Sequence, residues 1–159
     1  MGEPSVSRTT EHLTRLAVEI AAEMELEVLS VKVSGGGGHR IVRLDVDRAG
    51  PVGVNLADCE NLSVAIGGAI EDTALFGAPY SLEVSSPGID RPIQTDDDAR
   101  RNTGRRVVVE TRLPLSGKTR FHGVLAGVSG SNWIVRGEDG TEWAVPSEMV
   151  IRACQDCRF

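Results

Sequence analysis

Two short segments contain residue types that phosphate-binding and metal-binding sites use. Ser116-Gly117-Lys118-Thr119 matches the end of a phosphate-binding loop. Such a loop also needs a glycine separated from the Gly-Lys pair by four residues, because its backbone must curl around the phosphates, and position 112 is arginine. Alternating, strand-like patterns flank the segment on both sides, so we predict a hairpin turn here.

The second segment is a single CxxC pair formed by Cys154 and Cys157. A structural zinc ion takes four protein ligands, and a redox pair of this kind needs a thiol at a helix N-terminus. The third cysteine, Cys59, is predicted to lie on the buried face of a helix as a small apolar side chain. We therefore predict no metal and no cofactor, and a zinc or redox protein that uses the CxxC pair stays as an alternative.

Nucleophilic catalysis has no support in the sequence either. Ser85 and Ser86 lack the GxSxG turn that exposes a nucleophilic serine, and no histidine has a recognisable triad context. The glycines at 35–38 lie between two predicted strands, so they predict a flexible turn rather than an anion site, which would need a helix N-terminus. We predict that the protein is not an enzyme.

Basic side chains gather at the start of the second half of the chain. Arginine presents a planar fork of donors that suits phosphate groups, so this basic cluster could contact RNA. The alternative is a charged surface that has no ligand. The candidate residues are Arg100, Arg101, Arg105, Arg106, Arg112, Lys118 and Arg120.

The net charge of the 159-residue chain is −6, and it is divided unevenly. Residues 1–98 carry seven basic and 17 acidic side chains, a net charge of −10. Residues 99–159 carry ten basic and six acidic side chains, a net charge of +4. An acidic half attracts basic proteins, and a basic half can approach RNA. Two Trp, one Tyr and three Phe are too few for a surface that binds RNA by stacking its bases.

The sequence also bears on the compartment in which the protein works. No apolar run reaches the roughly 20 residues that span a bilayer. Residues 1–10 lack the apolar region of a secretory signal, and three cysteines do not suit a disulfide framework. We expect a cytoplasmic protein.

The first half is predicted to be a two-layer α+β domain. Helical spacing of apolar residues predicts a helix over 10–24, and alternation predicts strands over 27–34 and 42–47. Asn55 is a good N-cap for a second helix that ends near residue 75, and a short strand follows over 80–84. Two helices would then cover one face of a small sheet. We assign residues 10–93 to this domain, after a flexible N-terminus of residues 1–9.

The second half is predicted to contain strands and turns. Residues 94–103 are predicted to be a linker or one short helix, with acidic residues first and basic residues last, as the helix dipole favours. Short strands at close spacing suggest a small barrel that closes on itself, and we assign it, with a short tail, to residues 104–159. The predicted strands cover 106–111, 120–128, 133–136, 142–145 and 150–154.

The segment Tyr80–Ile93, with the sequence YSLEVSSPGIDRPI, resembles the signature of the bacterial ribosome maturation factor RimP family. Further matches are Arg43–Asp47, Val54–Cys59 with Ser63, and Arg101–Arg105. The resemblance covers roughly residues 10–153. It implies an α+β fold, with a KH-like N-terminal domain followed by an Sm-like or SH3-like barrel.

The resemblance also implies a function. Members of this family are non-enzymatic factors that bind the free small (30S) ribosomal subunit late in assembly. They are associated with a basic small-subunit protein near the decoding region and with the adjacent 16S rRNA. The alternative is a stand-alone Sm-like RNA-binding module whose barrel forms rings. An assembly factor bound at a single site should be a monomer, whereas a ring would elute several-fold larger.

We predict two charged contacts with the ribosomal particle. The acidic domain would attract the basic protein, and the basic cluster would lie toward rRNA or the same protein. Docking of this kind is sensitive to salt. The acidic candidates are Asp45, Asp47, Glu60, Glu71 and Asp72.

We also predict a hinge between the two domains. Gly88 permits positive φ, the neighbouring prolines restrict the backbone, and Asp90 and Arg91 can supply charged hydrogen bonds. The predicted hinge residues are Ser86, Pro87, Gly88, Asp90, Arg91 and Pro92.

Overall fold

The computed structural model describes residues 4–35, 38–77, 79–88 and 90–156, with side chains from residue 8 onward. The chain divides into two compact units. Unit 1 comprises Met1–Arg48 and Gly53–Pro87, and unit 2 comprises Ala49–Val52 and Gly88–Phe159. Residues 49–52 therefore belong to unit 2, although the residues on both sides of them belong to unit 1.

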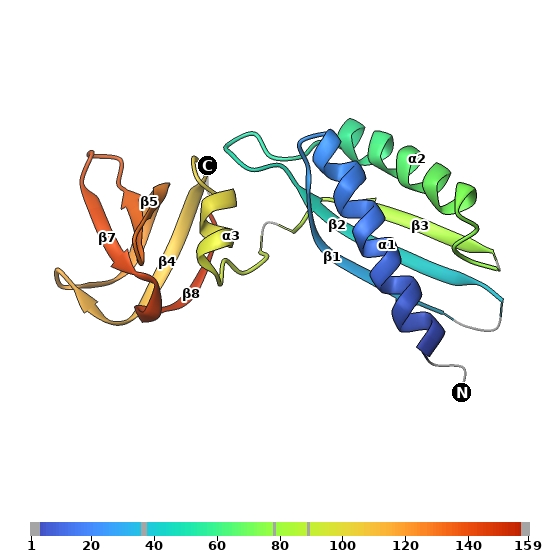
Figure 1. Cartoon of the computed structure of the whole chain (residues 1–159). Helices are drawn as coiled ribbons and strands as arrows, with labels where there is room; N and C mark the ends of the chain where they lie inside the picture. The colour runs from blue at the N-terminus through green and yellow to red at the C-terminus, as the bar shows by residue number, and fades with distance from the viewer. Residues whose placement is uncertain (1–3, 36–37, 78, 89, 157–159) are drawn as a thin grey trace. The chain divides into compact units, whose positions relative to one another are not determined.

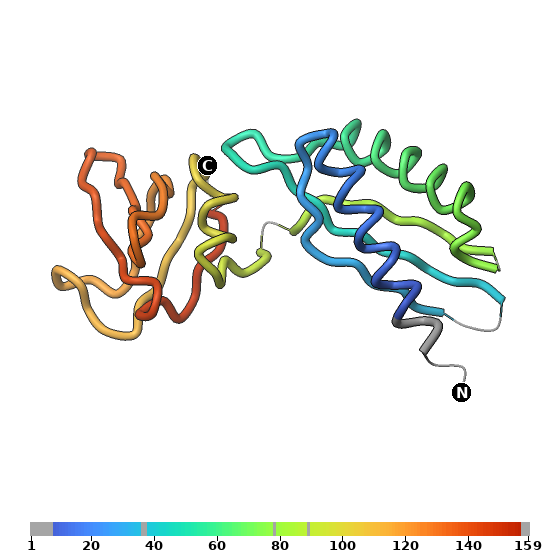
Figure 2. Tube along the Cα trace, viewed as in Figure 1, coloured from blue at the N-terminus to red at the C-terminus, as the bar shows by residue number. Residues whose placement is uncertain are grey.

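Unit 1 consists of two helices and a three-stranded sheet (Figure 1). In the sheet, the central strand β2 pairs antiparallel with β1 and parallel with β3. A parallel pair needs a crossover connection, which α2 provides. Both helices lie on the same face of the sheet, as the trace in Figure 2 also shows. The elements, which confirm the predicted order, are α1 (Pro4–Glu23), β1 (Glu27–Ser34), β2 (Arg40–Asp47), α2 (Leu56–Asp72) and β3 (Tyr80–Ser85).

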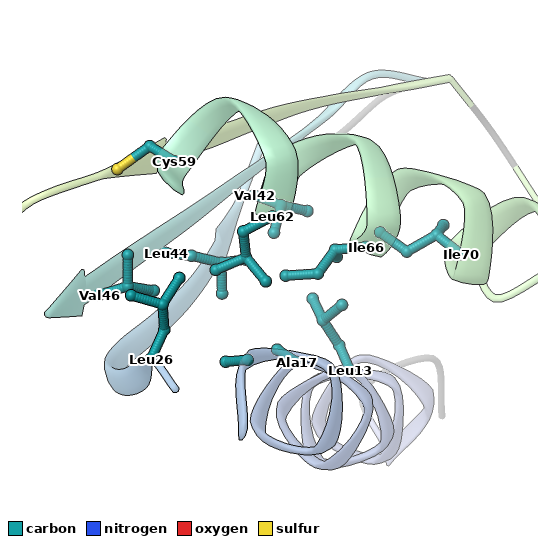
Figure 3. Packing of buried hydrophobic residues seen from close by; sticks show 11 residues of the cluster. Leu13, Ala17, Leu26, Val42, Leu44, Val46, Cys59, Leu62, Ile66 and Ile70 are labelled. Carbon is teal, nitrogen blue, oxygen red and sulfur yellow. The ribbon is translucent and has the colours of Figure 1, made fainter. Parts of the chain in front are cut away.

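The core of unit 1 lies between the sheet and the two helices. Alternate residues of β2 face the helices, because successive side chains of a strand point to opposite faces. Figure 3 shows Leu62 and Ile66 of α2 between this row and Leu13 of α1. The buried side chains are aliphatic apart from one cysteine: Leu13, Ala17, Ala21, Leu26, Val42, Leu44, Val46, Cys59, Leu62, Ile66 and Ile70.

Unit 2 contains a short helix and a five-stranded antiparallel sheet in the order β7-β6-β5-β4-β8. The last strand returns to pair with the first, and the five predicted strands are confirmed. Among the residues described, β7 and β8 are not paired, so the predicted closed barrel is not found. The elements are α3 (Asp96–Arg101), β4 (Arg106–Leu115), β5 (Lys118–Ser129), β6 (Asn132–Arg136), β7 (Glu142–Pro146), the 3-10 helix η1 (Ser147–Met149) and β8 (Val150–Gln155).

The core of unit 2 has two large aromatic side chains, Phe121 and Trp133, among smaller aliphatic ones. The Trp133 indole N–H donates a hydrogen bond to the Asp96 carboxylate at 2.8 Å, which links the sheet to α3. Gly123 of β5 passes so close to β6 that a Cβ there would overlap the Arg136 carbonyl. This position therefore requires glycine.

The first helix begins at Pro4, earlier than the predicted start at residue 10. Residues 94–103 were predicted to be a linker or one short helix, and the structure has the short helix α3, with acidic residues in its first turn and basic residues in its last. Its Ala99 is fully buried within unit 2. Of the glycine turn at 35–38, positions 36 and 37 lie outside the described residues.

The segment that resembles a phosphate-binding loop is a hairpin turn, as predicted. Leu115 pairs with Lys118 across it, at the junction of β4 and β5. Ser116 and Gly117 both have positive φ, at 50° and 77°. This is the backbone conformation of a two-residue hairpin turn, and no helix follows to face a phosphate.

Candidate functional site

The acidic candidates Glu60, Glu71 and Asp72 are exposed side chains of α2. Asn55 caps this helix: its side chain accepts the Asp58 N–H at 2.8 Å, while the Asp58 carboxylate accepts the Asn55 N–H at 3.0 Å. Within the described part of the chain, none of the three candidates forms an ion pair. They are available to a cationic partner.

Asp58, on the first turn of α2, has a structural role instead. Its carboxylate binds the Arg48 guanidinium at 2.6 Å. This charged hydrogen bond, with the N–H of Asn55, holds the pKa of Asp58 below its ordinary value. The Asp58 charge therefore fixes the start of α2.

The two aspartates of β2 have different environments. Asp45 lies on the sheet face away from the helices, where its carboxylate accepts hydrogen bonds from the hydroxyls of Ser30 at 3.0 Å and Ser85 at 3.1 Å. Asp47 is only 2% exposed, and its carboxylate accepts the N–H of Arg48. The prediction that Asp47 is a surface contact was wrong, because this last residue of β2 is buried.

The predicted basic cluster separates into buried and exposed arginines. Arg101, 3% exposed, binds the Asp98 carboxylate at 3.1 Å. Arg105 is also buried; it donates to the Gly50 carbonyl at 2.8 Å and to the Asn102 side chain at 3.1 Å. Both guanidinium groups hold unit 2 together, so predicting them as RNA contacts was wrong.

Asp98 is the partner that organises α3. Burial alone would raise the pKa of Asp98, but the N–H groups of Gln94 and Thr95 and the Arg101 guanidinium outweigh it. The pKa of Asp98 therefore lies below its ordinary value. Its carboxylate stays charged near neutral pH and keeps Arg101 in place.

The remaining basic candidates are exposed. Arg100 pairs with Asp97 at 2.9 Å, and Arg106 pairs with Glu138 at 3.1 Å. Lys118 lies over the Trp143 ring, with 4.6 Å between its Nζ and the ring centroid. Arg112 and Lys118 lie on the β4–β5 hairpin, whereas Arg120 lies farther along β5. These side chains are spread along unit 2 rather than gathered in one patch.

One basic residue that the sequence patterns did not single out joins Arg120 on the sheet. Glu110 of β4 pairs in register with Arg120 of β5 on one side and with Arg152 of β8 on the other. The Arg120 guanidinium lies 3.5 Å from the Glu110 carboxylate. Together with Val108 and Cys154, these side chains line a small surface hollow. Only the pairing of β4 with β8 brings Arg152 here.

The predicted hinge residues follow β3. Gly88 does not have positive φ, so that part of the argument was wrong. A Cβ at position 88 would instead lie 2.6 Å from the Asp90 carboxylate. The Arg91 N–H donates to the Gly88 carbonyl at 3.0 Å, which closes a tight turn. Residue 89 lies outside the described residues.

The structure bears in part on the cysteine alternative. Burial raises the pKa of the Cys59 thiol, and the nearby Asp58 charge raises it further, so this thiol stays protonated near neutral pH. Cys154 is half-buried in β8, and Cys157 lies outside the described residues. In the described ranges, no group of three or more His, Cys, Asp or Glu side chains could hold a metal ion.

Among the described residues, no helix is both long and apolar enough to span a bilayer.

A comparison with protein families identifies the first unit. Residues 16–90 match the family model of the RimP N-terminal domain. The match begins within α1 and ends after β3, so it includes the sheet, α2 and the start of the predicted hinge.

Proposed function

The chain belongs to the RimP family, a family of ribosome maturation factors whose partner is the small ribosomal subunit, and we propose that it binds the free 30S subunit and assists its late assembly. The match of residues 16–90 carries this proposal. The family is not a known enzyme family. We infer a cytoplasmic role, since the small subunit is assembled there.

We infer that unit 1 contacts a basic small-subunit protein near the decoding region. The support is the net charge of unit 1, which is −7 from six basic and 13 acidic side chains, and the exposed carboxylates of α2. Asp45 is a weaker candidate, because two serine hydroxyls already bind its carboxylate. The proposed residues are Asp45, Glu60, Glu71 and Asp72.

We infer that unit 2 lies toward 16S rRNA or the same protein. The support is the exposure of its remaining basic side chains, which lie in the segment 99–159. This segment has a net charge of +4, and the whole of unit 2 has a net charge of +1. An Sm-like barrel in unit 2 stays a proposal, favoured by the return of β8 to β4. A KH-like fold for unit 1 is likewise proposed. The proposed contact residues are Arg100, Arg106, Arg112, Lys118, Arg120 and Arg152.

The segment from Ser86 to Pro92 is proposed to be a hinge. Arg91 is half-buried in a tight turn, so we expect Arg91→Ala to change the relative orientation of the two units more than either fold. Residual dipolar couplings measured on both units test this. Couplings that fit the same alignment in the wild type and the variant would remove the hinge proposal.

Sucrose-gradient fractionation of growing cells tests the function. We expect the protein in fractions that hold free or immature small subunits, and not in those of translating ribosomes. Purified free subunits should bind it more weakly as salt rises from about 50 to 300 mM. Absence from every small-subunit fraction would refute the proposed function, and binding that is indifferent to salt would refute its electrostatic basis.

A further inference from the structure

The solvent side of α2 exposes large apolar side chains. Leu56 and Val64 are 75% and 78% exposed, and Glu60 lies between them at helical spacing. The buried side of the helix, which carries Leu62 and Ile66, points to the core (Figure 3). Leu56, Glu60 and Val64 are exposed, so they lie outside this buried side. We call Leu56, Glu60, Val64, Gly67, Gly68 and Glu71 the outer face of α2.

Two glycines lie in the middle of α2, and the backbone carbonyl of Gly67 accepts a hydrogen bond from the Tyr80 hydroxyl at 3.4 Å, a contact that any residue could make. Glycine is unfavourable in a helix interior, and neither Gly67 nor Gly68 has the positive φ that would require it. A Cβ added at either position would meet no atom within 4 Å. Nothing in the described structure therefore requires these glycines. What a missing Cβ provides is a place where a second molecule can approach the helix backbone closely.

The charges of α2 select the kind of molecule that could approach. The helix contains no Lys or Arg, and Glu71 and Asp72 stand at its C-terminal end, where the helix dipole favours cations. Within the described residues, neither of them nor Glu60 has an ionic partner. These carboxylates repel a phosphate backbone and attract a basic polypeptide. Features that break local rules without internal compensation are expected at functional surfaces.

We propose that the outer face of α2 is the docking surface for a basic protein segment of the small subunit. Apolar side chains of that segment pack against Leu56 and Val64, its backbone approaches Gly67 and Gly68, and its Lys or Arg side chains bind Glu60 and Glu71. This inference rests on the proposed function, because it assigns the contact surface for the basic protein partner.

The variant Gly68→Ala separates docking from folding. Alanine favours the helix, so thermal unfolding followed by circular dichroism should shift upward by a few degrees. The added methyl group should block close approach, so the affinity of the labelled full-length chain for purified free small subunits should fall about tenfold. An unchanged affinity in this more stable variant would overturn the inference.

Two valine variants test the same surface independently of any effect of Gly68→Ala on the fold. Val64→Ala removes an exposed valine from the outer face, and Val18→Ala removes one from α1, where the side chain is 49% exposed. We expect Val64→Ala to weaken subunit binding about fivefold and Val18→Ala to leave it unchanged. Equal effects of the two substitutions would refute a specific role for this face.

The same titrations distinguish this inference from the proposed function. If the wild-type chain does not bind free small subunits, the proposed function itself fails, and the inference fails with it. If the wild type binds but Gly68→Ala and Val64→Ala bind equally well, only the inference fails. A parallel titration uses protein-free 16S rRNA. If both variants weaken that binding to the same extent, the occupant is RNA and the proposed protein partner is wrong.

Discussion

Arg100 and Arg101 are neighbours on α3, and each binds the aspartate three residues before it. Their surroundings differ, because Arg100 is exposed and Arg101 is buried. Removing one member of a buried pair leaves a charge without its partner, so Arg101→Ala should lower the free energy of unfolding by about 2–3 kcal/mol. Urea unfolding followed by tryptophan fluorescence measures this, since both tryptophans lie in unit 2.

The matched control is Arg100→Ala, which breaks an exposed pair and should change stability by less than about 0.5 kcal/mol. The dependence of the unfolding free energy on pH gives a second measurement. Because the pKa of Asp98 is lowered in the folded state, the Asp98 carboxylate stabilises the fold above about pH 4. This stabilisation is lost as the pH falls through the folded-state pKa. In Arg101→Ala this acid-dependent loss should be smaller. An unfolding free energy that is equal in both variants would contradict the buried role of Arg101.

Position 123 requires glycine, because backbone atoms rather than a side chain occupy the space beside it. A Cβ at this position would lie against the Arg136 carbonyl and 3.2 Å from the Cα of Gly137. Backbone in the middle of a sheet cannot move aside without losing ladder hydrogen bonds. Gly123→Ala should therefore destabilise unit 2 by about 3 kcal/mol.

Thermal unfolding of Gly123→Ala can be compared with that of Gly77→Ala. Gly77 has no positive φ, and a Cβ there would meet no atom within 4 Å. If Gly123→Ala unfolds at the same temperature as Gly77→Ala, the close approach of β5 to β6 is not as the structure describes.

The sequence shows where the arginines are in the chain, but it does not show what role each of them has. The sequence shows a cluster of arginines, but the burial of Arg105 depends on a hydrogen bond to Gly50, which is 55 residues earlier in the chain. Arg152 joins Arg120 only through Glu110, which lies between them in the sheet. No local pattern contains such long-range pairings, so the sequence could not predict which of these arginines are buried and which are exposed.

At the scale of elements, the capping box makes Asn55 the residue that starts α2. Its side chain satisfies the Asp58 N–H, which has no partner inside the helix. Asn55→Ala should therefore lower the free energy of unfolding by about 1 kcal/mol, measured by urea unfolding with circular dichroism. Asn61→Ala is the matched control. It removes the same side chain from an exposed position inside α2, where alanine should stabilise by a few tenths of a kcal/mol. A loss of stability in both variants would contradict the capping role.

Elements were predicted well where periodicity and turn residues agree. The strand over 27–34 and the N-cap at Asn55 are confirmed at the predicted residues, since both depend on local sequence. The early start of α1 was missed because residues 4–9 do not continue the apolar stripe. Closure of a barrel is not a local property either: strand patterns predict the five strands of unit 2 but not which of their edges pair.

At the scale of the whole molecule, the oligomeric state depends on the free edges of the unit 2 sheet. A ring of Sm-like modules would need open edges on β7 and β8. β7 has only five residues and ends at Pro146, which has no N–H to donate. Part of the β8 edge is already used, because the Ala153 carbonyl accepts the Ile93 N–H at 2.8 Å. Short or covered edges of this kind disfavour pairing between chains.

We therefore expect a monomer. Size-exclusion chromatography with light scattering should give the mass of one 159-residue chain at every concentration tested. Ile93→Pro is an informative variant, since it removes the N–H that covers β8 and should allow concentration-dependent association if that contact protects the edge. A wild-type particle several times the mass of one chain would favour the ring-forming RNA-binding module. A factor that docks at one place on the small subunit has no need for such a ring, because the exposed carboxylates of unit 1 and the exposed basic side chains of unit 2 already give each chain both of its proposed contacts.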